Sequence, residues 1–263
     1  MGGPAPFDIE VPQPRVEPTP RWVRVRAGAQ LIADSRRALL LVWYGPGMLP
    51  TYCFPAEDVR IDLMHPSAEA DPSAEAASGW VAEHDVRIGD DLLERAAQRF
   101  SDPPDPLSAL DGHWSFTWDG CVSWFEEALE VGTHARDPSK RVDVVPSERH
   151  VRVELGGELV AESHRPHALF ESWLPTRWYL PAEDVRRELL EPSQTVTTCP
   201  YKGTARYWSV RTGNEIHRDV AWSYPDPVAE TPRIAGLVTF LNEKVDLVID
   251  GVPQKRPFTP WSL

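Results

Sequence analysis

Cysteine is scarce in this sequence of 263 residues, and none of the three cysteines belongs to a C-x-x-C pair. Cys53, Cys121 and Cys199 cannot all pair with one another within a single chain. Proteins of the reducing cytoplasm keep such thiols free, whereas small secreted domains use many cysteines in disulfides. We therefore expect reduced thiols and a cytoplasmic location.

Long apolar runs and basic clusters are missing as well. No segment has the unbroken apolar stretch of a transmembrane helix, and the first residues, M-G-G-P-A-P, have no signal-peptide pattern. The formal net charge is −13, and no cluster of Lys and Arg interrupts the acidic background. Nucleic acids and anionic membrane surfaces attract basic faces, so we expect neither as a partner.

Proline and tryptophan, in contrast, are abundant, with 27 and 11 residues. Proline at this density disfavours long helices and favours short strands that are joined by rigid turns. The composition therefore predicts a mainly β protein, and the length is enough for two domains of ordinary size.

The chain repeats itself. Residues 21–60 and residues 149–186 both begin with V-R-V, pass a glycine, reach a Ser-x-Arg element and end with P-A-E-D-V-R. A match of this density indicates a tandem duplication. We assign the first copy to residues 21–140 and the second copy to residues 141–263, after a Pro-rich arm over residues 1–20.

Each copy begins with the pattern of a β-hairpin. Its V-R-V segment alternates as a half-buried strand does, and Gly28 in the first copy or Gly156 and Gly157 in the second supply the turn. Pro55 and Pro181 then precede acidic residues, which is typical of the first turn of a helix. We expect a short helix there, over residues 181–190 in the second copy.

Beyond that point the copies diverge. The second copy has the turn C-P-Y-K-G at residues 199–203, whereas the first copy has an acidic, alanine-rich loop over residues 66–79. Residues 90–100 of the first copy read as a helix. Residues 114–118 are the expected counterpart of residues 237–240, so the framework continues while one polar loop is replaced.

Three segments of the second copy resemble a known family. They are the P-A-E-D-V element, T-T-C-P-Y-K-G-T-A-R-Y-W-S-V at residues 197–210, and A-W-S-Y-P-D-P at residues 221–227. They are similar to the bacterial and fungal domain-of-unknown-function family 427, and the resemblance covers nearly the whole chain as two copies. It implies two tandem β-tent-like domains, in each of which small antiparallel sheets meet at an angle and carry a short helix.

The resemblance implies no reaction. The family has been labelled a nucleotidyltransferase family, but that chemistry needs carboxylates for Mg²⁺ and a cradle for phosphates, and this sequence has no P-loop or Gly-rich loop. β-tent relatives often hold zinc with two C-x-x-C pairs, which are absent here. His164 and His167 have metal-ligand spacing but no third ligand nearby. We expect no metal and no cofactor.

The turn at residues 199–203 is the best candidate for chemistry. Cys199 would act as a nucleophile in its thiolate form, which a neighbouring Lys202 favours. Lys202 itself would form a Schiff base or bind an anion, and Asp226, between two prolines, would supply a catalytic carboxylate. The alternative is a structural cysteine beside a turn, a solvated Lys202, and a turn residue at position 226.

Aromatic residues surround this turn in the sequence of the second copy. They would form a cage for a flat or cationic ligand, or they would simply fill the core. An arginine nearby would hold a carboxylate or phosphate, or would pair on the surface. The predicted ligand-binding residues are Tyr201, Arg206, Trp208, Trp222, Tyr224 and Trp178.

Three hypotheses follow for function. In the first, the second copy binds a small organic metabolite and acts on it as an enzyme. In the second, the same copy is a ligand-binding module with an aromatic cage and no catalysis. In the third, the first copy has a rebuilt site, with the loop over residues 66–79 and the expected helix over residues 90–100 as a lid. Its pocket would lie between the rings of Trp43, Tyr52, Trp80 and Trp114.

Overall fold

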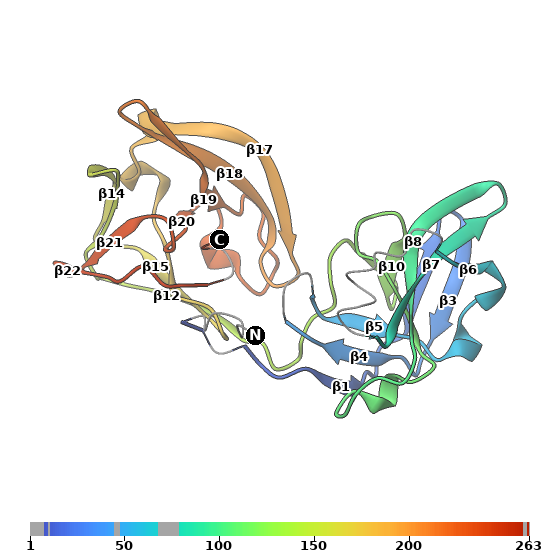
Figure 1. Ribbon diagram of the computed structural model, residues 1–263. Coiled ribbons are helices and arrows are strands. Elements are labelled where there is room, and N and C mark those ends of the chain that lie inside the picture. Colours follow the sequence, from blue (N-terminus) through green and yellow to red (C-terminus); the bar gives the residue numbers. More distant parts are fainter. Residues whose placement is uncertain (1–7, 10, 45–47, 68–78, 260–261, 263) are drawn as a thin grey trace. The chain divides into compact units, whose positions relative to one another are not determined.

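The computed structural model describes residues 8–9, 11–44, 48–67, 79–259 and 262. It divides into two compact units (Figure 1). The first unit comprises residues 12–137, and the second comprises residues 138–263 together with residues near the N-terminus. The loop that we expect over residues 66–79 lies mostly outside the described residues.

The first unit consists of three small antiparallel sheets with the orders β1-β4-β5, β11-β10-β2-β3 and β6-β7-β8-β9. Its strands are β1 (Arg15–Pro18), β2 (Val23–Ala27), β3 (Gln30–Ser35), β4 (Leu39–Val42), β5 (Thr51–Cys53), β6 (Met64–Pro66), β7 (Val81–Ile88), β8 (Asp91–Phe100), β9 (Trp114–Phe116), β10 (Ser123–Glu126) and β11 (Leu129–Val131). Within the described residues, they are joined by the 3₁₀ turns η1 (Ala56–Asp58), η2 (Ile61–Leu63) and η3 (Ser108–Leu110).

The second unit has the same three sheets, with the orders β12-β15-β16, β14-β13-β21-β22 and β17-β18-β19-β20. Its strands are β12 (Val142–Pro146), β13 (Val151–Leu155), β14 (Glu158–Ser163), β15 (His167–Glu171), β16 (Arg177–Tyr179), β17 (Leu190–Cys199), β18 (Gly203–Thr212), β19 (Glu215–Ser223), β20 (Val238–Phe240), β21 (Asp246–Ile249) and β22 (Val252–Pro253). Its 3₁₀ turns are η4 (Ala182–Asp184), η5 (Arg187–Leu189) and η6 (Pro232–Ile234). The prediction of a mainly β, duplicated fold is confirmed.

The sequence elements that the two copies share form the same set of hydrogen bonds in each unit. In the second unit, Ser163 donates a hydrogen bond to Asp184 (2.7 Å), and Arg165 donates to the same carboxylate (3.1 Å). In the first unit, Ser35 and Arg37 bind Asp58 in the same way (2.7 Å and 3.0 Å). The Ser-x-Arg and P-A-E-D-V elements therefore fasten η1 and η4 to the strands β3 and β14.

The prediction of one short helix over residues 181–190 is wrong. Two 3₁₀ turns, η4 and η5, occupy this segment, and Val185 between them is extended (φ −109°, ψ 134°). Val185 forms a β-bridge to Ala161, and the N–H of Arg186 donates to the carbonyl of Val160 (2.9 Å). The backbone donors are thus used by strand β14, so no i→i−4 ladder forms.

The expected helix over residues 90–100 is also wrong, because these residues form strand β8. Ala96, Ala97 and Phe100 are buried there, and β8 lies between β7 and β9. Tertiary packing overrides the helix propensity of an alanine-containing segment. Residues 15–18, which we expect in an N-terminal arm, form the edge strand β1.

A β-bulge occurs at the same place in both units. Arg95 (φ +50°) and Asp219 (φ +52°) both adopt the left-handed conformation. The N–H of Arg95 donates to the carboxylate of the buried Asp85 (2.8 Å), and the N–H of Asp219 donates to the hydroxyl of Ser209 (3.3 Å). One side chain on the neighbouring strand therefore satisfies the unpaired donor of each bulge.

Membrane-spanning helices are not a feature of the described chain, since none of its helices has the length and apolar character needed to cross a bilayer.

The bulge of the first unit provides a test of this arrangement. We expect Asp85→Ala to destabilise the first unit by about 1–3 kcal/mol, because it removes a partly buried hydrogen bond from the N–H of Arg95 to a charged acceptor. Asp85→Ser, which copies Ser209 of the second unit, is the matched control and should recover most of the loss. Urea unfolding of the full chain measures both; equal stability of the Ala and Ser variants would contradict the role of the acceptor.

Candidate functional site

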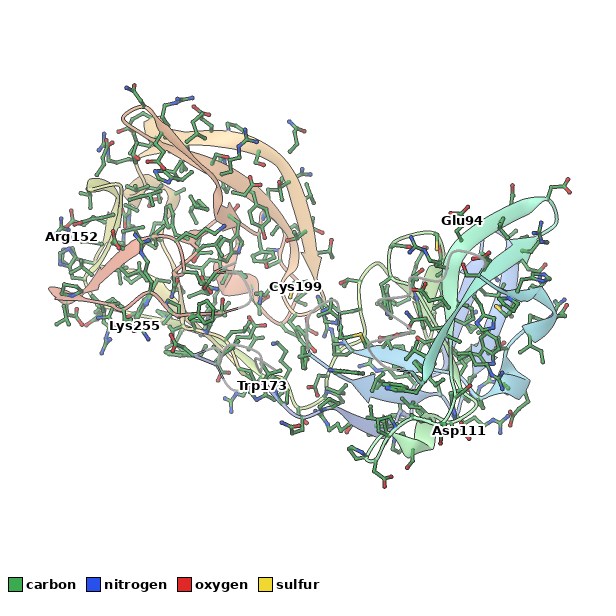
Figure 2. The ribbon with its side chains drawn as sticks, in the orientation of Figure 1. Glu94, Asp111, Arg152, Trp173, Cys199 and Lys255 are labelled. Carbon is green, nitrogen blue, oxygen red and sulfur yellow. The ribbon has the colours of Figure 1, made fainter. Side chains whose placement is uncertain are left out.

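The turn at residues 199–203 is built as the sequence predicts, at the end of the β17–β18 hairpin (Figure 2). Cys199 lies opposite Gly203 in the register of the two strands, and the N–H of Lys202 donates to the carbonyl of Cys199 (3.3 Å). Gly203 has φ +102°, and a Cβ there would lie 3.1 Å from the carbonyl oxygen of Asp226. Glycine is therefore required, because the two loops of the second unit approach closely at this point.

The turn directs Lys202 inward, where it forms a buried ion pair. Its ammonium donates to the carboxylate of Glu171, which ends strand β15. Lys140 contacts the other carboxylate oxygen (3.2 Å). The side chains of all three residues are buried, with exposed fractions between 4% and 11%. One carboxylate thus lies between two ammonium groups, away from bulk water.

These charges fix each other's protonation states. Burial by itself would raise the pKa of Glu171, but the charges of Lys202 and Lys140 outweigh it and hold that pKa below its usual value. Burial by itself would lower the pKa of Lys202, but Glu171 and, to a smaller extent, Cys199 raise it above its usual value. Lys202 is therefore an ammonium ion and Glu171 a carboxylate at neutral pH.

Two buried phenols complete this polar centre. Burial raises the pKa of Tyr179, and Trp222 acts in the opposite direction; Glu171 and Cys199 raise it further. Among the described residues, no group makes a well-oriented hydrogen bond to the Tyr179 hydroxyl. Burial also raises the pKa of Tyr224, and the neighbouring Tyr179 and Cys199 raise it further. We call Glu171, Lys202, Cys199, Tyr179 and Tyr224 the polar centre.

A second ion pair borders the polar centre. Arg177 makes a bidentate contact with Glu243 (2.7 Å and 2.8 Å), and the hydroxyl of Thr259 donates to the same carboxylate (2.8 Å). The guanidinium lies 5.6 Å from the ring centre of Trp222. The pKa of Glu243 is below its usual value, because Arg177 outweighs the opposing effect of burial.

The first unit has the same strands without these charges. The strand registers place Trp43 where the second unit has Glu171, and Thr51 where it has Arg177. Cys53 takes the position of Tyr179 by the same registers. The N–H of Gly112 donates to the carbonyl of Phe100, and the N–H of Gly236 donates to the carbonyl of Tyr224. Phe100 therefore takes the position of Tyr224. The polar centre is therefore a property of the second unit.

The predicted site residues separate into groups. Cys199, Lys202, Trp222 and Tyr224 lie in or beside the polar centre, and the ring of Tyr201 lies 5.7 Å from the ammonium of Lys140. Trp178 and Trp208 pack with the other hydrophobic cluster of this unit.

Two further predicted residues point away from the polar centre. Arg206 and Asp226 are exposed at the surface of the second unit. Asp226 approaches the turn only through its backbone carbonyl, next to Gly203.

Sequence reasoning missed Glu171 and Lys140. Glu171 is the fifth residue of the alternating segment H-A-L-F-E, so strand periodicity places it on the buried side with Leu169. A buried carboxylate in a strand needs a cation beside it, so the acid on the buried face of this strand was the available indication of an ion pair. Nothing in the sequence indicates that Lys140, outside any strand, would meet it.

The rings that would line a pocket in the first unit are packed instead. Trp43 stacks on Trp80 with ring centres 5.8 Å apart and an angle of 9°, and Trp80 also contacts Phe100. Tyr52 and Trp114 belong to the other cluster of the first unit. This packing does not favour a rebuilt site in the first copy.

Metal ligands do not converge in the described part of the chain, where no group of three or more His, Cys, Asp and Glu side chains is placed to hold an ion. His164 stacks on His150 with ring centres 4.1 Å apart. His167 lies apart from that pair, in strand β15.

The fold and the polar centre define a duplicated β protein in which one copy has a charged, buried centre. A family model matches the chain twice, over residues 15–127 and residues 143–251. The family is described as a domain of unknown function (DUF427), and the chain belongs to it as a tandem pair. No curated protein matches the chain.

The buried pair predicts an acid-sensitive second unit. The pKa of Glu171 is lowered in the folded state from an ordinary value of 4.5. Its stabilisation is therefore complete above that pH and is lost as the pH falls from 4.5 through the lower, folded pKa. Glu171→Gln should cost about 3–5 kcal/mol at neutral pH, because Lys202 loses its counter-charge.

Urea unfolding of the full chain between pH 3 and pH 7 (roughly the window in which carboxylates titrate) measures this effect. The difference between the wild type and Glu171→Gln should shrink as the pH falls below 4.5. Glu183→Gln, at an exposed carboxylate, is the control and should show no such trend. A difference that is independent of pH would contradict the pairing.

Proposed function

We propose that the second unit binds a small organic molecule at the polar centre. The main support is the comparison within the chain. Burying charges costs free energy, and apolar residues often replace a buried ion pair without loss of stability. The first unit has the same fold with Trp43 and Thr51 in place of Glu171 and Arg177. The charges are therefore not needed for folding, which favours a functional role.

The polar centre has the groups that a ligand site needs. Lys202 offers a fixed ammonium, Glu171 a fixed carboxylate, and Tyr179 a buried hydroxyl without a well-oriented partner in the described chain. Such a hydroxyl is able to exchange a hydrogen bond with a ligand. Cys199 and Tyr201 connect this centre to the protein surface, because Cys199 is only partly buried. These groups suit a small molecule with both an acceptor and a donor.

Binding, rather than covalent chemistry at Lys202, is what the charges favour. A Schiff base requires a neutral amine, whereas Glu171 raises the pKa of Lys202. Glu171 between two ammonium groups is a weak base for the same reason. Asp226 lies at the surface and supplies no carboxylate to the centre in this arrangement.

A thermal-shift screen of the full chain against a library of small metabolites tests this proposal. A compound at 100 times its Kd should stabilise the second unit by about 2.7 kcal/mol. The double variant Glu171→Gln/Lys202→Gln, which replaces the ion pair by neutral amides of similar size, should lose the shift. Lys202→Ala should also lose it.

Arg206→Gln and Asp226→Asn are the matched controls, since both residues are polar, exposed and outside the centre. Both variants should keep the full shift. A shift that survives in the double variant, or a library in which no compound stabilises the wild type, would count against the polar centre as the binding site.

An enzymatic role is the second candidate, and one observation favours it. Cys199 is only partly buried and lies in the same turn as Lys202, whose N–H donates to the carbonyl of Cys199 (3.3 Å). A thiolate beside an ammonium is a nucleophile, and a bound metabolite would lie next to it. In this form, Cys199 is the nucleophile and Tyr179 donates a hydrogen bond to the reacting molecule.

Alkylation by iodoacetamide tests the reactivity of Cys199. Burial raises the pKa of the Cys53 thiol strongly, and burial together with Asp119 raises that of Cys121. We expect Cys199, which is only partly buried, to be alkylated before either. Peptide mass spectrometry follows all three thiols in one sample, so Cys121 is the internal control. Equal rates at Cys199 and Cys121 would count against a catalytic thiolate.

We further propose a cytoplasmic location and no cofactor, nucleic-acid or membrane partner. The three free cysteines support the location, because oxidising compartments favour disulfides. The net charge of −13 argues against anionic partners.

A further inference from the structure

The second unit contains a cavity of about 290 Å³ on the side of β16 opposite to the polar centre. Its apolar floor is Trp178, Val245, Leu247 and Ile249. Polar groups form its rim, namely Thr176, Asn242, Gln254, Arg149 and Lys255. An apolar floor with a few polar groups at the mouth is the usual composition of a small-molecule site.

The first unit fills the equivalent space with aromatic rings. Trp124 pairs with Val25 in β2, as Leu247 pairs with Val153 in β13, so the two positions correspond. Trp118 stacks on Trp124 with ring centres 4.2 Å apart and an angle of 7°.

The residue that corresponds to Trp118 in the second unit is Asn242. Both follow their strands, β9 and β20, by two residues, and both donate a hydrogen bond near the start of the neighbouring strand, β5 or β16. Trp118 bonds the hydroxyl of Thr51 (3.0 Å), and Asn242 bonds the carbonyl of Thr176 (2.8 Å). Small or aliphatic side chains in the second unit thus leave open a space in which the first unit stacks two indoles.

The rim also differs in charge from its counterpart. In the first unit, Glu126 accepts a hydrogen bond from Tyr52 (2.6 Å) and pairs with Arg21. Ile249 takes the place of Glu126 by register with β13, so Arg149 of the second unit reaches outward to Asp250 (3.5 Å). Lys255, labelled in Figure 2, is 82% exposed. Among the described residues, the lining therefore has two cations, Arg149 and Lys255, and no carboxylate.

We propose that this cavity binds a planar aromatic or heteroaromatic small molecule that carries a carboxylate. The ring takes the place of the Trp118 indole, lies on Leu247 and Ile249, and meets Trp178 at its edge. The carboxylate lies at the mouth, where Arg149 and Lys255 bind it in competition with Asp250 and Asp8. This site is separate from the polar centre, and neither proposal depends on the other.

Isothermal calorimetry of the full chain with indole-3-carboxylate tests the proposal, with indole and cyclohexanecarboxylate as probes that lack the charge or the planar ring. We expect indole-3-carboxylate to bind more tightly than either, by about tenfold. Asn242→Trp, which restores the ring of the first unit, should abolish binding and leave the thermal stability equal or higher, because it fills a cavity. Lys255→Met, at an exposed position, should reduce the affinity for indole-3-carboxylate part of the way to that for indole, because Arg149 still binds the carboxylate.

Leu247→Trp provides a second filled variant if Asn242→Trp packs poorly, and it should also abolish binding. The variant Glu171→Gln/Lys202→Gln should bind the probe as the wild type does, which distinguishes this cavity from the polar centre. The proposal is overturned if indole-3-carboxylate gives no binding heat at millimolar concentration, if both filled variants bind it unchanged, or if the polar-centre variant loses it.

Discussion

Alternation along strand β16 is the constraint on which the second unit depends. Successive side chains of a strand point to opposite faces, so Arg177 and Tyr179 join one cluster and Trp178 joins the other. One face leads to buried charges and phenols, and the other to an apolar cavity. A shift of one residue would exchange the two sets, so the register with β15 determines both candidate sites.

The duplication gives this protein an internal control. The two units have the same sheets. The hydrogen bonds of Ser163 and Arg165 with Asp184 recur as those of Ser35 and Arg37 with Asp58. Features that both units share serve the framework. Features that one unit has alone, such as the ion pair of Glu171, are free to serve a function, because the other unit folds without them.

The units also differ in how they use aromatic residues. The first unit stacks Trp118 on Trp124 and Trp43 on Trp80, which fills its core. The second unit places Trp222 beside Arg177 and leaves space next to Trp178. Aromatic abundance alone thus does not distinguish a ligand cage from core packing, since tryptophan serves in both ways within one chain.

Local periodicity and turn chemistry are sufficient to predict the repeat, the hairpins at Gly28 and Gly156, the mainly β class and the turn that presents Lys202. The strand over residues 90–100 could not be predicted in this way, since burial between two strands outweighs helix propensity. The contact of Lys202 with Glu171 rather than Asp226 depends on tertiary packing as well, because the pairing joins separate sheets and sequence spacing contains no information about that distance.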